Sequence, residues 1–220
     1  FTAASLTITL VFFALFGSMF LMTQYWQLVH GYSPLEAGVR LLPHAATMMI
    51  VAPLSARLVE RLGTKRVVLA GLTLITTGLL LLSTIEPDTP YITVISFFVV
   101  MASGMGMTMA PATESVMGSL PRDMAGVGSA VNDTTRQVGG ALGVAMIGSL
   151  VSSLYASRID VIAADLGLDA ATTAIAESSL GQAQMVAGQL GNPTLFADAN
   201  VAFVDAMTTG MVLSAAVILG

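Results

Sequence analysis

Six long, predominantly apolar runs of this chain contain no Asp, Glu, Lys or Arg, and this spacing of charge constrains the fold more than any other feature of the sequence. The runs are residues 1–35, 41–56, 67–85, 89–113, 137–157 and 206–220. A helix of about 20 apolar residues crosses the hydrocarbon core of a bilayer, which is about 30 Å thick. Uncharged runs of this length therefore predict an all-α membrane protein.

The overall composition excludes several other classes of protein. Only 10% of the residues are charged and 55% are hydrophobic, whereas soluble domains carry roughly 25% charged residues. The chain has no cysteine, so it has no disulfide and no Cys-based metal site. Its two histidines, His30 and His44, are too isolated to form a metal site. No basic stripe with interleaved aromatics indicates nucleic-acid binding, and no nucleophile or acid cluster within the helices indicates an enzyme.

The apolar runs give approximate bounds for six membrane-spanning helices. We expect them at about residues 6–29, 38–58, 67–83, 91–111, 126–151 and 201–220. Residues 152–200 hold one Arg and five acids, and we expect an extracytoplasmic loop with short surface helices near 169–190. The chain begins and ends inside apolar runs, so we expect a piece of a longer protein with its last helix truncated.

Several residues indicate where these helices begin or bend. Ser33, Pro34 and Glu36 form a capping box with Pro at the first helical position, which predicts a helix start at Pro34. Pro43 should bend the second helix, as should Pro53 further along it. Before the fourth helix, Thr89 is the expected cap and Pro90 the expected first residue.

Basic residues gather in one short stretch, which predicts the orientation of the chain. The stretch 54–66 holds four of the eight basic residues, namely Arg57, Arg61, Lys65 and Arg66. Short basic loops between membrane spans lie in the cytoplasm. With loop 57–66 inside, the cytoplasmic side also holds Arg122 and Arg136, and the opposite side holds only Arg40 and Arg158. The six-helix arrangement thus satisfies the positive-inside rule.

The fifth expected helix carries charges near its start and glycines further along. Asp133 and Arg136 are spaced i,i+3 and can pair; Glu114, after the fourth helix, is similarly placed. Ionisable residues near a membrane are candidates for function, here proton coupling, and the alternative is a structural pair at the helix end. Close helix packing is the expected role of three glycines, which are Gly139, Gly140 and Gly143.

One face of the first helix combines aromatic rings and amides. At 100° per residue, five side chains share an arc of about 80°: Phe13, Phe16, Phe20, Gln24 and Gln27. Rings offer contact area and cation–π attraction, and amides donate or accept hydrogen bonds. We therefore expect this face to line a path for lipophilic or cationic small molecules. In the alternative, Gln24 and Gln27 bond a neighbouring helix. Tyr25 should point to the far side.

The basic stretch also resembles a known loop motif. It is similar to the pattern G-x-L-x-D-R-x-G-x-[KR]-[KR] of the major facilitator superfamily, with Ala56 in place of the first Gly. The resemblance implies a gating loop at the cytoplasmic side, formed here by Leu58, Glu60, Arg61, Gly63, Lys65 and Arg66. Glu60 replaces the Asp of the pattern, which is typical of a second, degenerate copy in the C-terminal half of such proteins.

Two further stretches resemble one branch of that superfamily, the drug:proton antiporters with fourteen helices. They are residues 24–43, with Gln24-Tyr25-Trp26-Gln27, and residues 121–143, with Asn132 and Arg136. The resemblance implies a major-facilitator-type bundle, of which this is the C-terminal six-helix half. It implies a multidrug exporter in a bacterial plasma membrane, driven by a proton gradient without a cofactor. The implied partners are small-molecule substrates, membrane lipids and the missing N-terminal half. The alternatives are an exporter of an endogenous lipid or metabolite and a non-transporting scaffold or sensor.

Overall fold

The structure is a computed structural model that describes residues 2–121 and 124–219. Arg122 and Asp123, which the charge pattern assigned to a cytoplasmic loop, lie outside the described residues, as do Phe1 and Gly220.

Helices account for nearly all of the described residues. In chain order they are α1 (Thr2–Gln24), the π-helix η1 (Tyr25–Val29), α2 (Pro34–Arg40), α3 (Leu42–Leu62), α4 (Thr64–Leu82), α5 (Tyr91–Gly118), α6 (Ala125–Asp165), α7 (Ala170–Ser178), α8 (Leu180–Leu190) and α9 (Pro193–Leu219). Within the described ranges, six helical stretches are long and apolar enough to cross a membrane: α1 with η1, α2 with α3, α4, α5, α6 and α9. The predicted all-α fold with six spans is confirmed.

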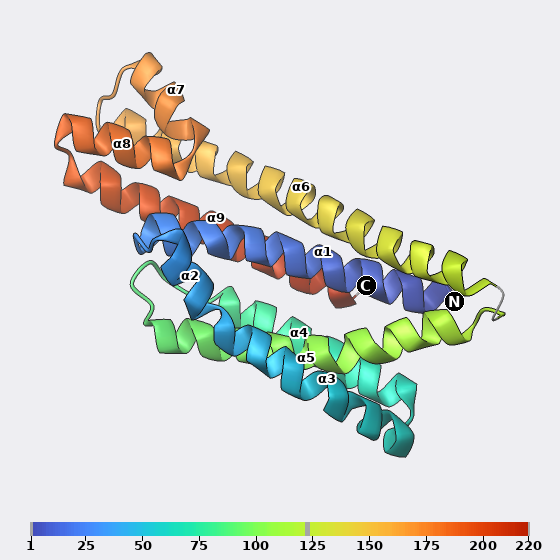
Figure 1. Ribbon diagram of the computed structural model, residues 1–220. Coiled ribbons are helices and arrows are strands. Elements are labelled where there is room, and N and C mark those ends of the chain that lie inside the picture. The colour runs from blue at the N-terminus through green and yellow to red at the C-terminus, as the bar shows by residue number, and fades with distance from the viewer. Residues whose placement is uncertain (1, 122–123, 220) are drawn as a thin grey trace.

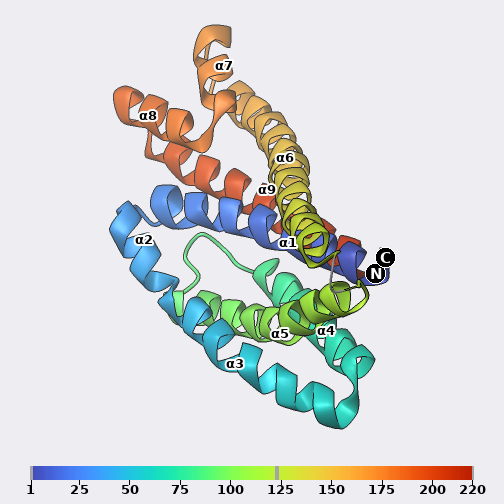
Figure 2. The same ribbon diagram turned by 45° about the vertical axis from the view of Figure 1, so that its right-hand side comes forward.

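The long helices form two packed groups. Helices α1, α6 and α9 contact one another, α5 contacts both α3 and α4, and α4 joins the groups through α9. Figures 1 and 2 show α7 and α8 at one end of the bundle, where α6 ends and α9 begins. The α3–α4 turn and both chain ends lie at the other end. We call these the α7–α8 end and the α3–α4 end.

Two expected boundaries differ most from the structure, because helix caps lie further out than the apolar runs indicate. Helix α6 continues past residue 151 to Asp165, since Tyr155 and Ile159 on its inner face stay buried. Helix α9 begins at Pro193 rather than 201, and the Asn192 side chain accepts hydrogen bonds from the N–H groups of Thr194 and Leu195. The stretch 152–200 is therefore mostly helical, and α7 and α8 confirm the short helices expected near 169–190.

The proline and cap signals were right in part. The capping box at Ser33 is present, and α2 begins at Pro34 as predicted. The bend expected at Pro43 is a break at Leu41, after which α3 starts anew with Pro43 in its first turn. Thr89 does not cap α5: its hydroxyl accepts the Glu86 N–H at 2.7 Å, and the helix starts at Tyr91.

Candidate functional site

Glycines of α6 allow it to pack closely against α1. A side chain at Gly139 would meet the backbone of Thr9, and one at Gly143 would meet the backbone of Phe13. Glycine lets two helix backbones approach closely in a membrane, where packing rather than hydrophobicity holds helices together. The two helices thus touch along this seam.

The structure separates the five side chains that were expected to line a path. Phe16 and Phe20 are 47% and 42% exposed, and Gln24 and Gln27 are half-buried. Phe13 is a correction: it is only 5% exposed, because Gly143 admits α6 directly against its backbone.

Gln27 also departs from the expected arc. It lies in the π-helical turn η1, where the chain turns by less than the 100° per residue of an α-helix. Its direction therefore cannot be extrapolated from Phe16. Tyr25, expected on the far side, is buried, and its hydroxyl donates to the Glu86 carbonyl at 2.8 Å.

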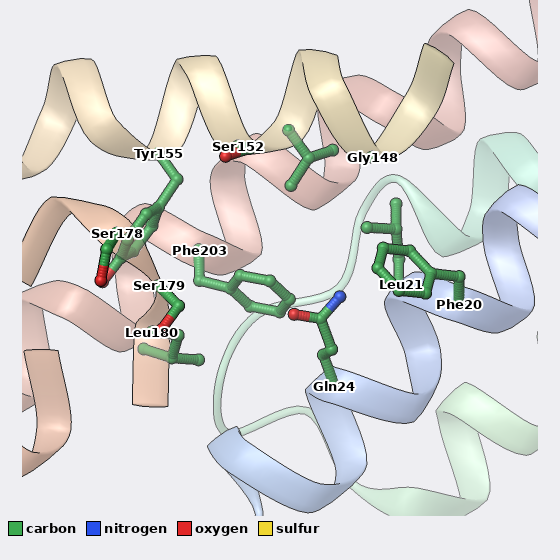
Figure 3. Close-up of a pocket in the computed structure, with 11 residues that line it drawn as sticks. Phe20, Leu21, Gln24, Gly148, Ser152, Tyr155, Ser178, Ser179, Leu180 and Phe203 are labelled. Atoms are coloured by element: carbon green, nitrogen blue, oxygen red, sulfur yellow. The ribbon is translucent and has the colours of Figure 1, made fainter. Parts of the chain in front are cut away.

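A pocket of about 180 Å³ opens beside Gln24 near the α7–α8 end, and we call it the Gln24 pocket. Figure 3 shows the Gln24 amide directed toward the Phe203 ring, with Phe20 and Leu21 beside it and Tyr155 opposite. Its lining comes from α1, α6, α9 and the α7–α8 junction: Phe20, Leu21, Gln24, Gly148, Val151, Ser152, Tyr155, Ser178, Ser179, Leu180 and Phe203. Sites for drug-sized ligands usually measure about 300–1,000 Å³, so this pocket fits one ring or one end of such a molecule.

Helices α7 and α8 form the roof of the Gln24 pocket and are tied to the bundle by side chains. The Gln184 amide donates to the Leu28 carbonyl in η1 at 2.9 Å and to the Asn200 side chain at 2.8 Å. Tyr155 donates to the Ala176 carbonyl at 3.4 Å. These bonds tie the roof to η1, α6 and α9.

A second pocket of about 390 Å³ lies along the same seam, toward the α3–α4 end, and we call it the Arg136 pocket. Its lining residues are Phe12, Phe16, Asp133, Arg136, Gln137, Gly140 and Ala141. Rings, an amide, an acid and a base thus face one concave surface. This mixture can contact flat apolar groups and also accept or donate hydrogen bonds.

The expected pair of Asp133 with Arg136 does not form. Arg136 instead donates to the Thr113 hydroxyl of α5 at 3.1 Å, and its guanidinium carbon lies 5.4 Å from the Phe12 ring centroid. Within the described ranges the ion pair closer than 4 Å is Arg158–Asp205. Arg136 therefore joins α6 to α5 and α1, and leaves Asp133 exposed. Glu114 is also exposed.

The basic turn is as short as a helix connection can be. Helix α3 ends at Leu62, α4 starts at Thr64, and Gly63 between them has φ +81° and ψ 151°. A side chain there would contact nothing within 4 Å but would be strained, because this backbone conformation favours glycine. The four bases and Glu60 are exposed and Leu58 is half-buried. In the described part of the chain Glu60 makes no ion pair.

Several residues of these pockets were missed by sequence reasoning. Ser179 followed by Gln182 is a capping pattern, and its hydroxyl accepts the Gln182 N–H; this signal could have placed the start of α8. No local signal marks Thr113 or Phe203, whose roles arise from packing between distant segments. Over the described residues, no group of three or more His, Cys, Asp or Glu could hold a metal ion.

Comparison with known proteins gives one family. Residues 1–144 match the sequence profile of the Major Facilitator Superfamily. The chain is 30% identical over 222 residues to a multidrug efflux pump, LfrA, of Mycolicibacterium smegmatis, a match that covers all of this chain and 44% of that protein. It is 34% identical over 152 residues to a tetracenomycin C resistance and export protein of Streptomyces glaucescens, covering 69% of this chain and 28% of that protein.

A third relative agrees with these two. The multidrug resistance protein Stp of Mycobacterium tuberculosis is 33% identical over 154 residues, covering 70% of this chain and 28% of that protein. The chain therefore spans less than half the length of the relatives it matches.

Proposed function

The chain belongs to the major facilitator superfamily, and we propose that it forms the C-terminal half of a proton-coupled multidrug exporter in a bacterial plasma membrane. Relatives named for multidrug efflux, drug resistance and export support this proposal. Its proposed partners are small-molecule substrates, membrane lipids and an N-terminal half of the same protein.

The observation that carries the proposal is the seam between α1 and α6, which holds two pockets of mixed chemistry. The Gln24 pocket offers rings and an uncharged amide. The Arg136 pocket offers rings, the Gln137 amide and the exposed Asp133 carboxylate. Rings attract flat and cationic guests, and no single hydrogen-bond pattern restricts the guest. A seam of this kind suits a substrate range that is broad rather than specific.

Transport would proceed by alternating access, in which two halves rock about a site near the middle of the membrane. In the proposed arrangement the α1–α6 seam faces the N-terminal half, and the two pockets lie at successive depths along it. A substrate would pass from the Arg136 pocket to the Gln24 pocket, under the roof of α7 and α8. Proton influx would supply the energy, with Asp133 and Glu114 as the proposed proton-coupling carboxylates of this half.

The basic turn is the proposed gating loop at the cytoplasmic side. Gly63→Val would strain the turn, and Arg61→Ala would remove a charge that can bind the other half. Both variants of the full-length protein should insert normally but transport more slowly. Normal transport in both would leave the turn with only an orienting role.

The proposed function is tested by dye efflux from cells that carry the full-length protein. We expect a lipophilic cationic dye to leave against its gradient, a protonophore to stop this efflux, and Phe20→Ala or Gln24→Ala to slow it. Gly126→Ala is the matched control, because a side chain there contacts nothing within 4 Å. Efflux of an endogenous lipid or metabolite alone would instead favour an exporter of such compounds. No efflux of any compound would favour a non-transporting scaffold or sensor.

A further inference from the structure

A second groove lies between α6 and α9, on the side away from the Gln24 pocket. It measures about 450 Å³ and is lined by Ser157, Arg158, Val161, Asp198, Val201 and Asp205, among others. Phe203 lines the Gln24 pocket, and Val201 and Asp205 stand two residues to either side of it. Two residues correspond to about 200° of helix turn, so the groove and the pocket lie on opposite sides of α9.

The depth of the groove follows from hydrogen bonds at the end of α1. Gln184 bonds both Leu28 and Asn200, which places these two residues at the same level. Asp205 lies five residues further along α9, or about 7–8 Å deeper at about 1.5 Å per residue. The 28-residue span Thr2–Val29 is about 42 Å long, so each end extends about 6 Å beyond a core of about 30 Å. Asp205 therefore lies near the boundary of headgroups and hydrocarbon.

The face that carries the groove is otherwise apolar. Val201, Val212 and Leu219 are exposed on α9 and lie within about 20° of one another around the helix. Asp205 lies about 40° from Val201 on the same stripe. An exposed apolar stripe on a membrane-spanning helix contacts lipid chains, and a charged residue on it requires polar partners at the membrane surface.

The charges of the groove match one class of lipid headgroup. Arg158 Nη1 lies 2.6 Å from Asp205 Oδ2, and the two side chains remain 41% and 56% exposed. Asp198 makes no ion pair within the described ranges. One base and two acids leave a net charge of −1, which disfavours anionic lipids. A primary ammonium can donate to two carboxylates, whereas a choline group has no N–H to donate.

We propose that this groove binds a zwitterionic phospholipid with a primary amine headgroup, in the leaflet at the α7–α8 end. The ammonium group lies between Asp198 and Asp205. The phosphate accepts hydrogen bonds from the remaining Arg158 N–H groups and from the Ser157 hydroxyl. One acyl chain follows the stripe of Val201 and Val212. The proposal uses only the fold and these charges, and does not depend on what the protein transports.

The test is native mass spectrometry of the full-length protein released from nanodiscs. The discs contain equal parts of phosphatidylethanolamine, phosphatidylcholine and phosphatidylglycerol. We expect the protein to retain phosphatidylethanolamine preferentially, and Asp198→Asn to lower its retention about tenfold, as expected for losing one charge-assisted hydrogen bond. Asp198→Asn breaks no ion pair of the described residues, so the fold should be unaffected. Arg158→Gln should also lower retention.

Asp160→Asn is the matched control, because Asp160 is an acid on α6 that faces about 200° away from Arg158. The Asp160→Asn variant should retain as much phosphatidylethanolamine as the unaltered protein. Equal retention of all three lipids, or unchanged retention in Asp198→Asn, would overturn the proposal. So would a loss of dye efflux in Asp198→Asn with unchanged retention, since the groove would then serve a transported cation.

Discussion

At the scale of single residues, Tyr32 stacks with two basic side chains at the α7–α8 end. The His30 ring lies 5.4 Å from the Tyr32 ring at an interplanar angle of 19°, and the Arg40 guanidinium carbon lies 3.7 Å from the Tyr32 centroid. The Tyr25 and His30 rings also lie nearly perpendicular to each other, with their centroids 4.8 Å apart. Burial lowers the pKa of His30 below its usual value, and the nearby charge of Arg40 lowers it further. The folded protein therefore favours the neutral form of His30.

This stack predicts a pH dependence of stability. The unfolded chain binds a proton at His30 near the usual pKa of about 6.5, and the folded chain binds it only at lower pH. Stability from this group is thus full above about pH 6.5 and is lost as pH falls below it. Thermal unfolding of the full-length protein should show a smaller loss of Tm on acidification in His30→Gln than in the unaltered chain. If Tm falls equally with pH in both proteins, His30 is not the source of the pH dependence.

Cysteine labelling tests which side chains of α1 face the pathway. The sequence has no cysteine of its own, so single cysteines can be placed at Phe20, Gln24 and Tyr25 of a full-length protein without other thiols. A water-soluble thiol reagent should modify the first two, with protection by substrate. The buried Tyr25 position should stay unmodified. Labelling at Tyr25 but not at Gln24 would remove the Gln24 pocket from the path.

Residue spacing alone predicted part of this site. The helical period placed Phe16, Phe20 and Gln24 on one side of α1, and the first two are exposed there. The period could not show that Phe13 is buried, because this depends on Gly143, a residue 130 positions away in the sequence. Nor could it show that Arg136 prefers Thr113 to Asp133, since Thr113 belongs to another helix.

At the scale of helices, the α1–α6 contact depends on glycines, which have no side chain to keep the two backbones apart. Gly143→Val would drive a branched side chain into the Phe13 backbone, which cannot rotate away. Overpacking of this kind costs about 1–3 kcal/mol. The Tm of the full-length variant should fall accordingly, whereas Gly126→Ala on the same helix meets nothing within 4 Å and should leave it unchanged. Equal Tm values for the two variants would mean that the helices can separate at little cost.

The same scale shows why helix ends were harder to predict than helix cores. Lack of charge marks the part of a helix that lies in the membrane, but a helix ends where caps and packing end it. Helix α6 therefore runs 14 residues beyond the expected 151, and α9 starts eight residues before the expected 201. Asn192 followed by Pro193 is a start signal that composition alone does not reveal.

At the scale of the whole molecule, the two ends of the bundle should lie on opposite sides of the membrane. Figure 1 shows the α3–α4 turn and helix α7 at opposite ends. The basic residues of the turn predict that its end is cytoplasmic. Tags inserted at Thr64 and Asp169 should therefore report opposite sides, with Thr64 inside. Two tags on the same side, or Thr64 outside, would contradict the predicted orientation.

The number of spans could be predicted from the sequence because each span needs its own uncharged run. The order in which helices pack could not, because α1 meets α6 and α9, which are far from it in the sequence. Composition does not predict which helices pack together, because every span is apolar enough to pack against any other.

Helix α6 is long enough to act as a lever. It packs against the α1 backbone at Gly143, and it continues without a break to Asp165, about 33 Å further at about 1.5 Å per residue. If Gly143 is the fulcrum, a tilt of about 10° would carry Asp165 sideways by about 6 Å over that length. Helix α7, which packs on α6, would be carried with it. A fluorescent probe on the solvent-facing side of α7 would therefore report a small tilt of α6 as a displacement of several ångströms.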